Sequence, residues 1–467
     1  MPDDALSEHT PPAATPPSLA EAFWVWLRIG LLSFGGPAGQ IALMHKTLVE
    51  ERRWIGERRF LHALNYCMLL PGPEAQQLAT YIGWLMHRTA GGLVAGLLFV
   101  LPGALVMLGL SIGYVLYGHT PLIAGLFFGV KAAVLAVVAE AILRIGKRAL
   151  KTPVMIGLAV AAFLAIWLVQ VPFPIIVLSA GLVGFLGERR WPGRFAQGGG
   201  HGADGDGPDD GTGIIDAMFA RGELEHTRPA RGRSLRVFAV WLAVWLAPFI
   251  LLWIGLGPES VWTRIAGFFS TMGAVTFGGA YAVLSYVAQA AVQAFHWMTP
   301  GEMADGLGLA ETTPGPLIMV LQFVGFLAAY RHAGGLDPLL AGMLGALLTT
   351  WVTFAPSFLW IFLGGPYVEQ LRGNRALSGA LGAITAAIVG VIANLAVWFA
   401  LHTLFRQTTA VTLFGVGPEL PVLSSVDLRA LVLAAIALLA MLRFKAGMVP
   451  TLIGCALAGL VLTSAAL

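Results

Sequence analysis

The sequence predicts an all-α polytopic membrane protein, and three observations lead to this fold class. Of 467 residues, 57% are hydrophobic and only 11% are charged, against roughly 25% charged residues in ordinary soluble proteins. Glycine accounts for 58 residues, well above the usual ~7%. Apolar stretches near the ~20 residues that cross a bilayer recur along the chain. This composition excludes a soluble enzyme, a secreted disulfide scaffold and a nucleic-acid binder, because 28 Lys and Arg with 25 Asp and Glu cannot coat soluble domains.

The apolar stretches fall into two groups separated by one long polar stretch. The expected spanning segments are about 20–45, 60–86, 90–117, 122–143, 153–170 and 172–187 before it, and 236–256, 262–294, 303–330, 337–364, 376–405, 428–443 and 447–466 after it. The polar stretch carries eight arginines in a Gly- and Asp-rich context, which places it in the cytoplasm by the positive-inside rule and is typical of a linker.

These boundaries predict the domain organisation. The expected parts are a disordered tail at 1–18, a first membrane repeat at 19–187, a cytoplasmic Gly/Asp/Arg-rich linker at 188–234, a connecting transmembrane helix at 235–256 and a second, inverted membrane repeat at 257–467.

Two motifs recur at one spacing, which indicates an internal repeat. The SFGG motif at 33–36 matches TFGG at 276–279, and the PGP motif at 71–73 matches PGP at 314–316 (276 − 33 = 314 − 71 = 243). Further along, Pro102 matches Pro356, as Gly125 matches Gly379 (356 − 102 = 379 − 125 = 254), so a short insertion separates the two registers.

The number of crossings predicts how the two copies are oriented. Seven crossings separate the two starting points, so the second copy is expected to be upside down relative to the first. Inverted repeats of about six segments each are typical of secondary transporters, whose sites lie at the repeat interface near the bilayer midplane.

The loop at 46–59 allows two topologies. It carries five Lys and Arg residues, yet it lands outside if the first two segments each cross once. If both segments are re-entrant hairpins, this loop moves to the cytoplasm. Both segments hold Gly and Pro at their midpoints, where a helix must break. The alternative is an ordinary outside loop whose positive charge is partly offset by Glu50, Glu51 and Glu57.

The four Gly/Pro breaks are the expected substrate site. Non-helical backbone at membrane depth survives only where protein buries it or where it lines a wet cavity, and the N–H groups that begin each following half-helix favour an anion. Small polar side chains flank the breaks, Gln40 among them; the alternative role of these small residues is tight helix packing. The candidate substrate-binding residues are Ser33, Gly35, Gly36, Pro71, Gly72, Pro73, Gln76, Gln77, Lys131, Thr276, Gly278, Gly279, Thr312, Thr313, Pro314, Gly315 and Pro316.

Ionisable side chains inside apolar segments are costly and therefore suggest function. Glu74 follows the first PGP motif and Glu311 precedes the second. Each is a candidate proton-coupling residue, and the structural alternative is helix capping. Lys131 either neutralises a bound anion or pairs with a carboxylate in the bundle.

The chain lacks the motifs of the common cofactor-dependent chemistries. It has no P-loop, no dinucleotide fingerprint, no H-E-x-x-H and no C-x-x-C, and its two cysteines, Cys67 and Cys455, are isolated. We therefore expect no catalytic residues, no metal site and no cofactor.

Together the motifs resemble a known family. The sequence FGGPAGQIA at 34–42 followed by LPGPEAQQLA at 70–79 resembles the chromate ion transporter family. FGGAY at 277–281 and ETTPGP at 311–316 are similar to the second domain of its long, two-domain members. The resemblance covers nearly the whole chain outside the tail and the linker.

Membership implies a multi-pass protein of the bacterial inner membrane that expels chromate, a tetrahedral oxyanion, and confers chromate resistance. The expected partners are chromate, the bilayer and a proton or the membrane potential as driving force, with no nucleic acid. Sulfate is also implied, because its size and charge are close to those of chromate. The alternatives are a transporter of sulfate or another anion, and a membrane receptor or enzyme. A homodimer is left open.

Overall fold

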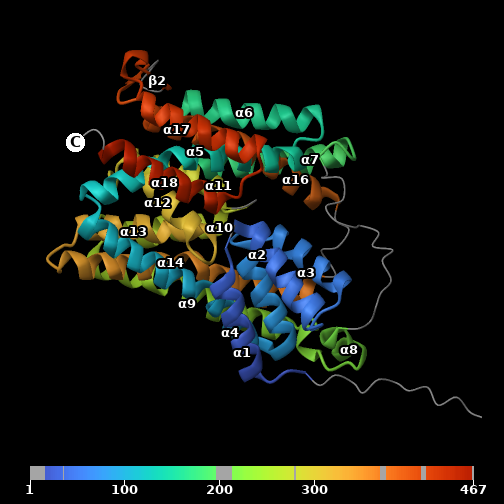
Figure 1. Ribbon diagram of the computed structural model, residues 1–467. Helices are drawn as coiled ribbons and strands as arrows, with labels where there is room; N and C mark the ends of the chain where they lie inside the picture. The colour runs from blue at the N-terminus through green and yellow to red at the C-terminus, as the bar shows by residue number, and fades with distance from the viewer. Residues whose placement is uncertain are drawn as a thin grey trace, which may run out of the picture.

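The computed structural model describes residues 16–34, 36–195, 213–277, 280–368, 375–411 and 417–464, and nearly all of them are helical (Figure 1). One small antiparallel pair of strands joins β1 (Thr408–Ala410) to β2 (Glu419–Pro421), with Thr409 opposite Leu420. The predicted all-α fold class of a polytopic membrane protein is confirmed.

The helices before the polar stretch are α1 (Leu19–Leu32), α2 (Gly36–His45), η1 (Lys46–Glu51), α3 (Glu57–Leu69), α4 (Glu74–Tyr117), α5 (Pro121–Ala149), α6 (Pro153–Val169) and α7 (Phe173–Arg190). Within the polar stretch lie α8 (Ile214–Ala220) and η2 (Glu225–Thr227). After it come α9 (Arg231–Leu256), α10 (Val261–Val275), α11 (Ala280–Gln289), η3 (Ala290–Ala294), α12 (Pro300–Thr312), η4 (Leu317–Met319), α13 (Val320–Arg331), α14 (Pro338–Gly364), η5 (Gly365–Tyr367), α16 (Arg375–Leu404), η6 (Leu423–Ser425), α17 (Leu428–Leu438), η7 (Leu439–Arg443) and α18 (Met448–Ser464).

The helices fall into long and short classes. Among the described residues, five helical stretches are long and apolar enough to cross a membrane: Glu74–Tyr117, Pro121–Ala149, Arg231–Leu256, Pro338–Tyr367 and Ala376–Leu404. By contrast, α1, α2 and α3 have 14, 10 and 13 residues, fewer than the ~20 that span a bilayer. Helices end at each expected break, so the segments predicted at 20–45 and 60–86 are each divided.

The α4 segment is a tight hairpin rather than one rod. Its backbone reverses at His87 and Arg88, and Arg88 has φ +54°. The two arms touch through glycine, because a Cβ on Gly91 would lie 2.2 Å from the carbonyl oxygen of Gly83. A larger residue at either position would separate the arms.

The α13–α14 pair repeats this arrangement in the second half. A Cβ on Gly345 would lie 2.6 Å from the carbonyl oxygen of Gly325, and Gly345 matches Gly91 at the larger offset (345 − 91 = 254). The expected insertion therefore falls in the longer turn between α13 and α14.

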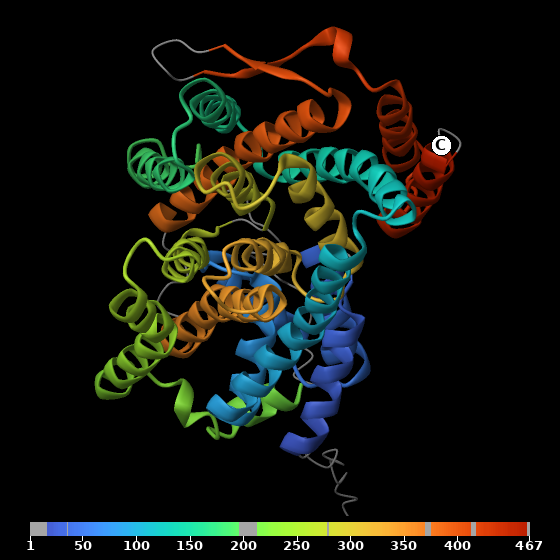
Figure 2. The same cartoon turned by 90° about the vertical axis from the view of Figure 1, so that its left-hand side faces the viewer.

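The remaining long helices exchange partners between the two halves of the chain. In Figure 2 the red C-terminal helices lie beside the cyan α5, and α5 packs closely on α17 and α18, as α16 does on α6 and α7. Glycine permits both contacts: a Cβ on Gly129 would lie 1.8 Å from the Cys455 carbonyl oxygen, and one on Gly390 would lie 1.9 Å from that of Ala159.

Part of the expected linker is packed structure. The Ile214 N–H donates to the Arg53 carbonyl oxygen at 3.0 Å. The Asp216 carboxylate accepts the Gly56 N–H at 2.7 Å and Arg59 Nε at 2.5 Å. Residues 213–227 thus dock onto the basic loop at 46–59, while 196–212 and the tail at 1–15 lie outside the described residues.

Several segments meet at the face where this docking occurs. His87 Nε2 lies 2.7 Å from the Pro17 carbonyl oxygen, and Arg52 Nη1 donates to Glu21 Oε1 at 3.3 Å. The start of α1, the loop before α3, the turn of the α4 hairpin and the docked segment 213–227 therefore share one face, which we call the linker face.

The docking of segment 213–227 should depend on pH through His226. Its ring Nε2 lies 2.9 Å from the Trp84 carbonyl oxygen. Burial lowers its pKa, aided by Arg88 and Arg233 and opposed by the Trp84 carbonyl. A lowered histidine pKa means that docking favours the neutral ring, so this stabilisation is complete above the ordinary pKa near 6.5 and is lost as the pH falls through the lowered value.

We therefore expect amide hydrogen exchange at 213–227, corrected for the intrinsic rates, to be faster at pH 5 than at pH 7.5. The His226→Asn variant keeps an N–H donor but does not titrate, so it should lose this extra pH dependence. The same pH dependence in His226→Asn would assign the effect to another group.

Candidate functional site

A small cavity lies where the four Gly/Pro breaks meet. It is lined by Pro37, Gln40, Gly72, Pro73, Glu74, Ala75, Thr276, Pro316, Leu317 and Ile318. These residues come from the first turns of α2 and α4, the end of α10 and the start of η4. Three helix starts therefore line one small volume, and because the first N–H groups of a helix have no intrahelical acceptor, such starts favour negative charge.

Two backbone hydrogen bonds cross between the breaks. The Gly72 N–H donates to the Thr276 carbonyl oxygen at 2.7 Å, and the Gly315 N–H donates to the Ser33 carbonyl oxygen at 2.8 Å. The two bonds are equivalent under the repeat, since Gly72 matches Gly315 and Ser33 matches Thr276 at the 243-residue offset (315 − 72 = 276 − 33 = 243). Each break therefore satisfies the other half's backbone.

Glycine is required at both crossing positions. Gly72 has φ +119° and Gly315 has φ +89°, a region that other residues rarely adopt. At Gly72 a Cβ would also lie 2.7 Å from Gln77 Nε2 and 3.1 Å from Ser357 Oγ. Glycine at these two positions is thus explained by the backbone conformation itself.

Gln40 belongs to this site, although the sequence prediction named it only as a flanking residue. Its Nε2 donates to the Gly315 carbonyl oxygen at 2.6 Å, and it is 1% exposed. The sequence contained a signal for this role. Gln40 lies four positions after Gly36 on a short helix, so both residues lie on the same face of that helix, next to the break.

The four expected hydroxyl donors are engaged elsewhere. Each donates to a carbonyl oxygen of its own helix: Ser33 to Ile29, Thr276 to Met272, Thr312 to Leu309 and Thr313 to Ala310. A hydroxyl has one proton, so in this conformation these groups offer an anion no hydrogen. Thr312 is also exposed, whereas Ser33, Thr276 and Thr313 are buried.

The two glutamines of α4 differ. Gln77 Nε2 donates to the Pro71 carbonyl oxygen at 2.7 Å and so supports the break. Gln76 is fully buried, and neither atom of its carboxamide has a hydrogen-bond partner within the described protein. Neither side chain lines the cavity.

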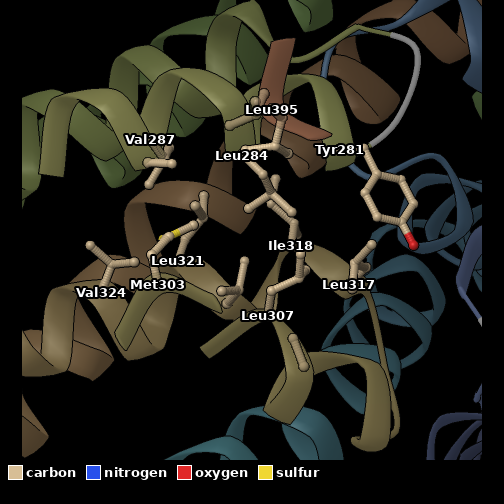
Figure 3. Packing of buried hydrophobic residues seen from close by; sticks show 14 of the residues in the cluster. Tyr281, Leu284, Val287, Met303, Leu307, Leu317, Ile318, Leu321, Val324 and Leu395 are labelled. Carbon is tan, nitrogen blue, oxygen red and sulfur yellow. The ribbon is translucent and has the colours of Figure 1, made fainter. Parts of the chain in front are cut away.

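The two candidate proton-coupling residues occupy different surroundings. Glu74 is the first residue of α4 and lines the cavity. Glu311 is 3% exposed and accepts a hydrogen bond from the Tyr281 hydroxyl at 2.5 Å. Figure 3 shows Tyr281 reaching out from α11, close to Leu317 at the start of η4. Tyr281 was not predicted from the sequence.

Lys131 lies outside the cavity lining. Its Nζ lies 3.3 Å from Asp305 Oδ2, and the Tyr114 hydroxyl donates to the same oxygen at 2.9 Å. Of the two roles considered for Lys131, the structure therefore contains the carboxylate pairing. Gly35, Gly278 and Gly279 lie outside the described residues. Among the described residues no cluster of His, Cys, Asp and Glu could hold a metal ion.

The same family is found by comparison with known proteins. A family model described as "Chromate transporter" matches residues 20–185 and 263–460. The chain belongs to the chromate transporter family. The predicted resemblance is confirmed, and the four-break cavity lies within the two matched stretches.

Individual relatives agree with this assignment. The chain is 31% identical over 428 residues to a chromate transport protein of Pseudomonas aeruginosa, covering 89% of each chain. It is 27% identical over 409 residues to a chromate transport protein of Cupriavidus metallidurans, covering 87% of this chain and 88% of the relative. A transporter of Bacillus subtilis, YwrB, is 32% identical over 125 residues, which is 27% of this chain and 64% of the relative. No solved structure shows a significant match.

Replacing Gly72 with alanine should destabilise the protein. The new Cβ would force a strained backbone at φ +119° and contact Gln77 and Ser357, at a cost of about 1–3 kcal/mol. A matched control is Gly109→Ala on α4, where a Cβ meets nothing within 4 Å and helix propensity improves by up to about 1 kcal/mol. Thermal unfolding in detergent compares the two, and equal melting temperatures would contradict the structural role of Gly72.

Proposed function

We propose that this chain is a secondary transporter that exports chromate across the bacterial inner membrane and thereby confers chromate resistance. The observation that carries the proposal is the cavity at the meeting of the four breaks, which three helix starts surround. Helix starts around a small volume suit a tetrahedral oxyanion, which needs several donors at once. Family membership supplies the substrate class.

The two matched stretches are, in this proposal, inverted repeats joined by a cytoplasmic linker. Three features support this: the equivalent pair of crossing backbone hydrogen bonds, the exchange of partners between α5 and α16, and the recurrence of the α4 hairpin in α13–α14. Sites at the interface of inverted repeats are the rule in secondary transporters.

The broken segments are proposed to be re-entrant hairpins. The chain enters at α1 and is back at the linker face by Arg52, and it leaves at α3 and returns there by His87. The five Lys and Arg residues of the 46–59 loop then lie on the same side as the docked segment 213–227. By the positive-inside rule this linker face is cytoplasmic.

Within the cavity, we assign chromate to the N–H groups that begin α2, α4 and η4. Gly36, Gly72 and Pro73, with Gly315 and Pro316 in the second half, let the backbone approach the ion. Four nearby hydroxyls could bind chromate only after breaking their hydrogen bonds to carbonyl oxygens of their own helices. They belong to Ser33, Thr276, Thr312 and Thr313. The charge of Lys131 is already met by Asp305, so we do not assign it to the substrate.

The membrane potential can drive export of a dianion. An inside-negative potential is worth about 2.3 kcal/mol per elementary charge per 100 mV, so about twice that acts on chromate. Protons are a second driving force in this proposal, and Glu74, the carboxylate in the cavity, is the group placed to carry one.

Chromate flux into inside-out vesicles tests the function directly. We expect uptake that excess sulfate inhibits, because both ions present four oxygens and two negative charges. Gly109→Ala should transport at the parent rate, since a Cβ there touches nothing. Absence of chromate uptake by folded protein would contradict the proposal, and sulfate uptake without chromate uptake would favour the alternative substrate.

The proton role has its own test. In Glu74→Gln the cavity keeps its shape but loses its titrating group, so we expect the pH dependence of chromate uptake to flatten. Glu259→Gln, an exposed residue paired with Arg264, is the control. If Glu74→Gln and Glu311→Gln both keep the parent rate and pH profile, proton coupling at these residues is excluded.

A further inference from the structure

The helix pair α2–α3 and its counterpart α11–α12, which lie between the breaks of the first and second halves, are packed unequally. In the second half, α12 packs on α5 and α16, and α11 packs on α16. Figure 3 shows this contact from close by, with Leu284 of α11 next to Leu395 of α16. In the first half, α3 packs on α4 and α2 packs on η1 and α4, and no comparable packing joins either of them to α5, α7 or α16 among the described residues.

The hydrophobic cores show the same inequality. Residues of α11 and α12, such as Tyr281 and Leu307, share one continuous core with α5 and α16. The described core of α1, α2 and α3 is separate and contains no residue of α5, α7 or α16. In Figure 1, α2 and α3 accordingly lie below α7 and α16, on the side of α8.

Two pairs of equivalent positions differ in exposure in the same direction. Met68 on α3 is 47% exposed, whereas Glu311, its counterpart on α12 (311 − 68 = 243), is 3% exposed. Asn65 is exposed and its counterpart Gly308 is buried. The surface that α12 buries against α5 is thus open on α3.

The closed side carries an ion pair. Asp305 of α12 meets Lys131 of α5, and Tyr114 of α4 donates to the same carboxylate. Their counterparts on the open side are His62 (305 − 62 = 243) and Thr385 (385 − 131 = 254), and because threonine carries no charge these two residues cannot form the same ion pair with each other.

We propose that the α2–α3 and α11–α12 hairpins are two alternating gates, and that the Lys131–Asp305 pair with Tyr114 is the latch that holds the second gate closed. The structure is then the state open at the linker face. In the opposite state α3 closes on α16 as α12 now closes on α5. This inference rests on the inverted repeats of the proposed function, and it adds Asp305 and Tyr114 as positioning residues that act through the gate.

The closed gate supplies the geometry for a test. A Cβ at Gly308 would lie 3.7 Å from Val130 Cβ, within the 3.5–4.5 Å range of disulfides, and the double variant removes the Val130 methyl that it would meet. The counterpart of this pair is Asn65 with Ile384 (308 − 65 = 243, 384 − 130 = 254). The alternating gates therefore predict that Asn65 and Ile384 reach disulfide distance only in the opposite state.

The experiment measures disulfide formation in membranes with a mild oxidant. The pairs Val130→Cys/Gly308→Cys and Asn65→Cys/Ile384→Cys are made with Cys67→Ala and Cys455→Ala, and thiols that remain free are counted by a maleimide-polymer gel shift. We expect the first pair to cross-link at least ten times faster than the second. Adding Asp305→Asn should slow the first pair and speed the second, and Lys131→Gln should act in the same direction.

Glu259→Gln, which removes one partner of an exposed ion pair, should leave both rates unchanged. Equal rates for the two pairs in the parent, or rates that neither latch variant alters, would overturn the gate assignment. Because cross-linking needs no chromate, its failure is distinct from a failure of the flux experiment.

Discussion

The structure depends on one constraint: backbone that leaves the helix in the interior of the protein must find hydrogen-bond partners there. Four breaks create this need, and the two crossing bonds from Gly72 to Thr276 and from Gly315 to Ser33 answer it. Each half of the chain supplies the acceptor that the other half lacks. The breaks are therefore stable only together, and the cavity they enclose is a product of the same arrangement.

Glycine makes this close assembly possible at several distances from the site. The paired glycines of the α4 hairpin, and those of α13 and α14, bring antiparallel arms into backbone contact. Gly129 and Gly390 do the same between α5 and α18 and between α16 and α6. Many of the chain's glycines thus lie at contacts where a side chain has no room, as expected for helix packing in membranes.

The sequence predicted the fold class from its apolar composition, and it predicted the position of the four helix breaks because Gly and Pro act locally on the backbone. Glu74 and Gly72, two of the predicted site residues, line the cavity. The sequence did not predict which polar side chains would form hydrogen bonds or ion pairs with other groups of the protein. The hydroxyls of Ser33 and Thr276 bond to their own helices, and Lys131 meets Asp305. These pairings depend on rotamers and on helices far apart in sequence, which spacing alone does not determine.

The docked segment at 213–227 was missed because its few apolar residues are buried by the loop at 46–59, not by one another.

The exchange of partners between α5 and α16 has a consequence for how such chains can be built. Each half presents a glycine-lined groove that the other half's terminal helices fill, so the association of the halves does not rely on the peptide that joins them. A chain of one half alone would leave its grooves and its broken backbone unmatched, and it could become complete only beside a second half. Fusion of two genes would then add a tether to an assembly already held by its own surfaces, and each half could afterwards acquire substitutions, such as aspartate in place of histidine at the gate, that an identical pair of subunits could not keep separate.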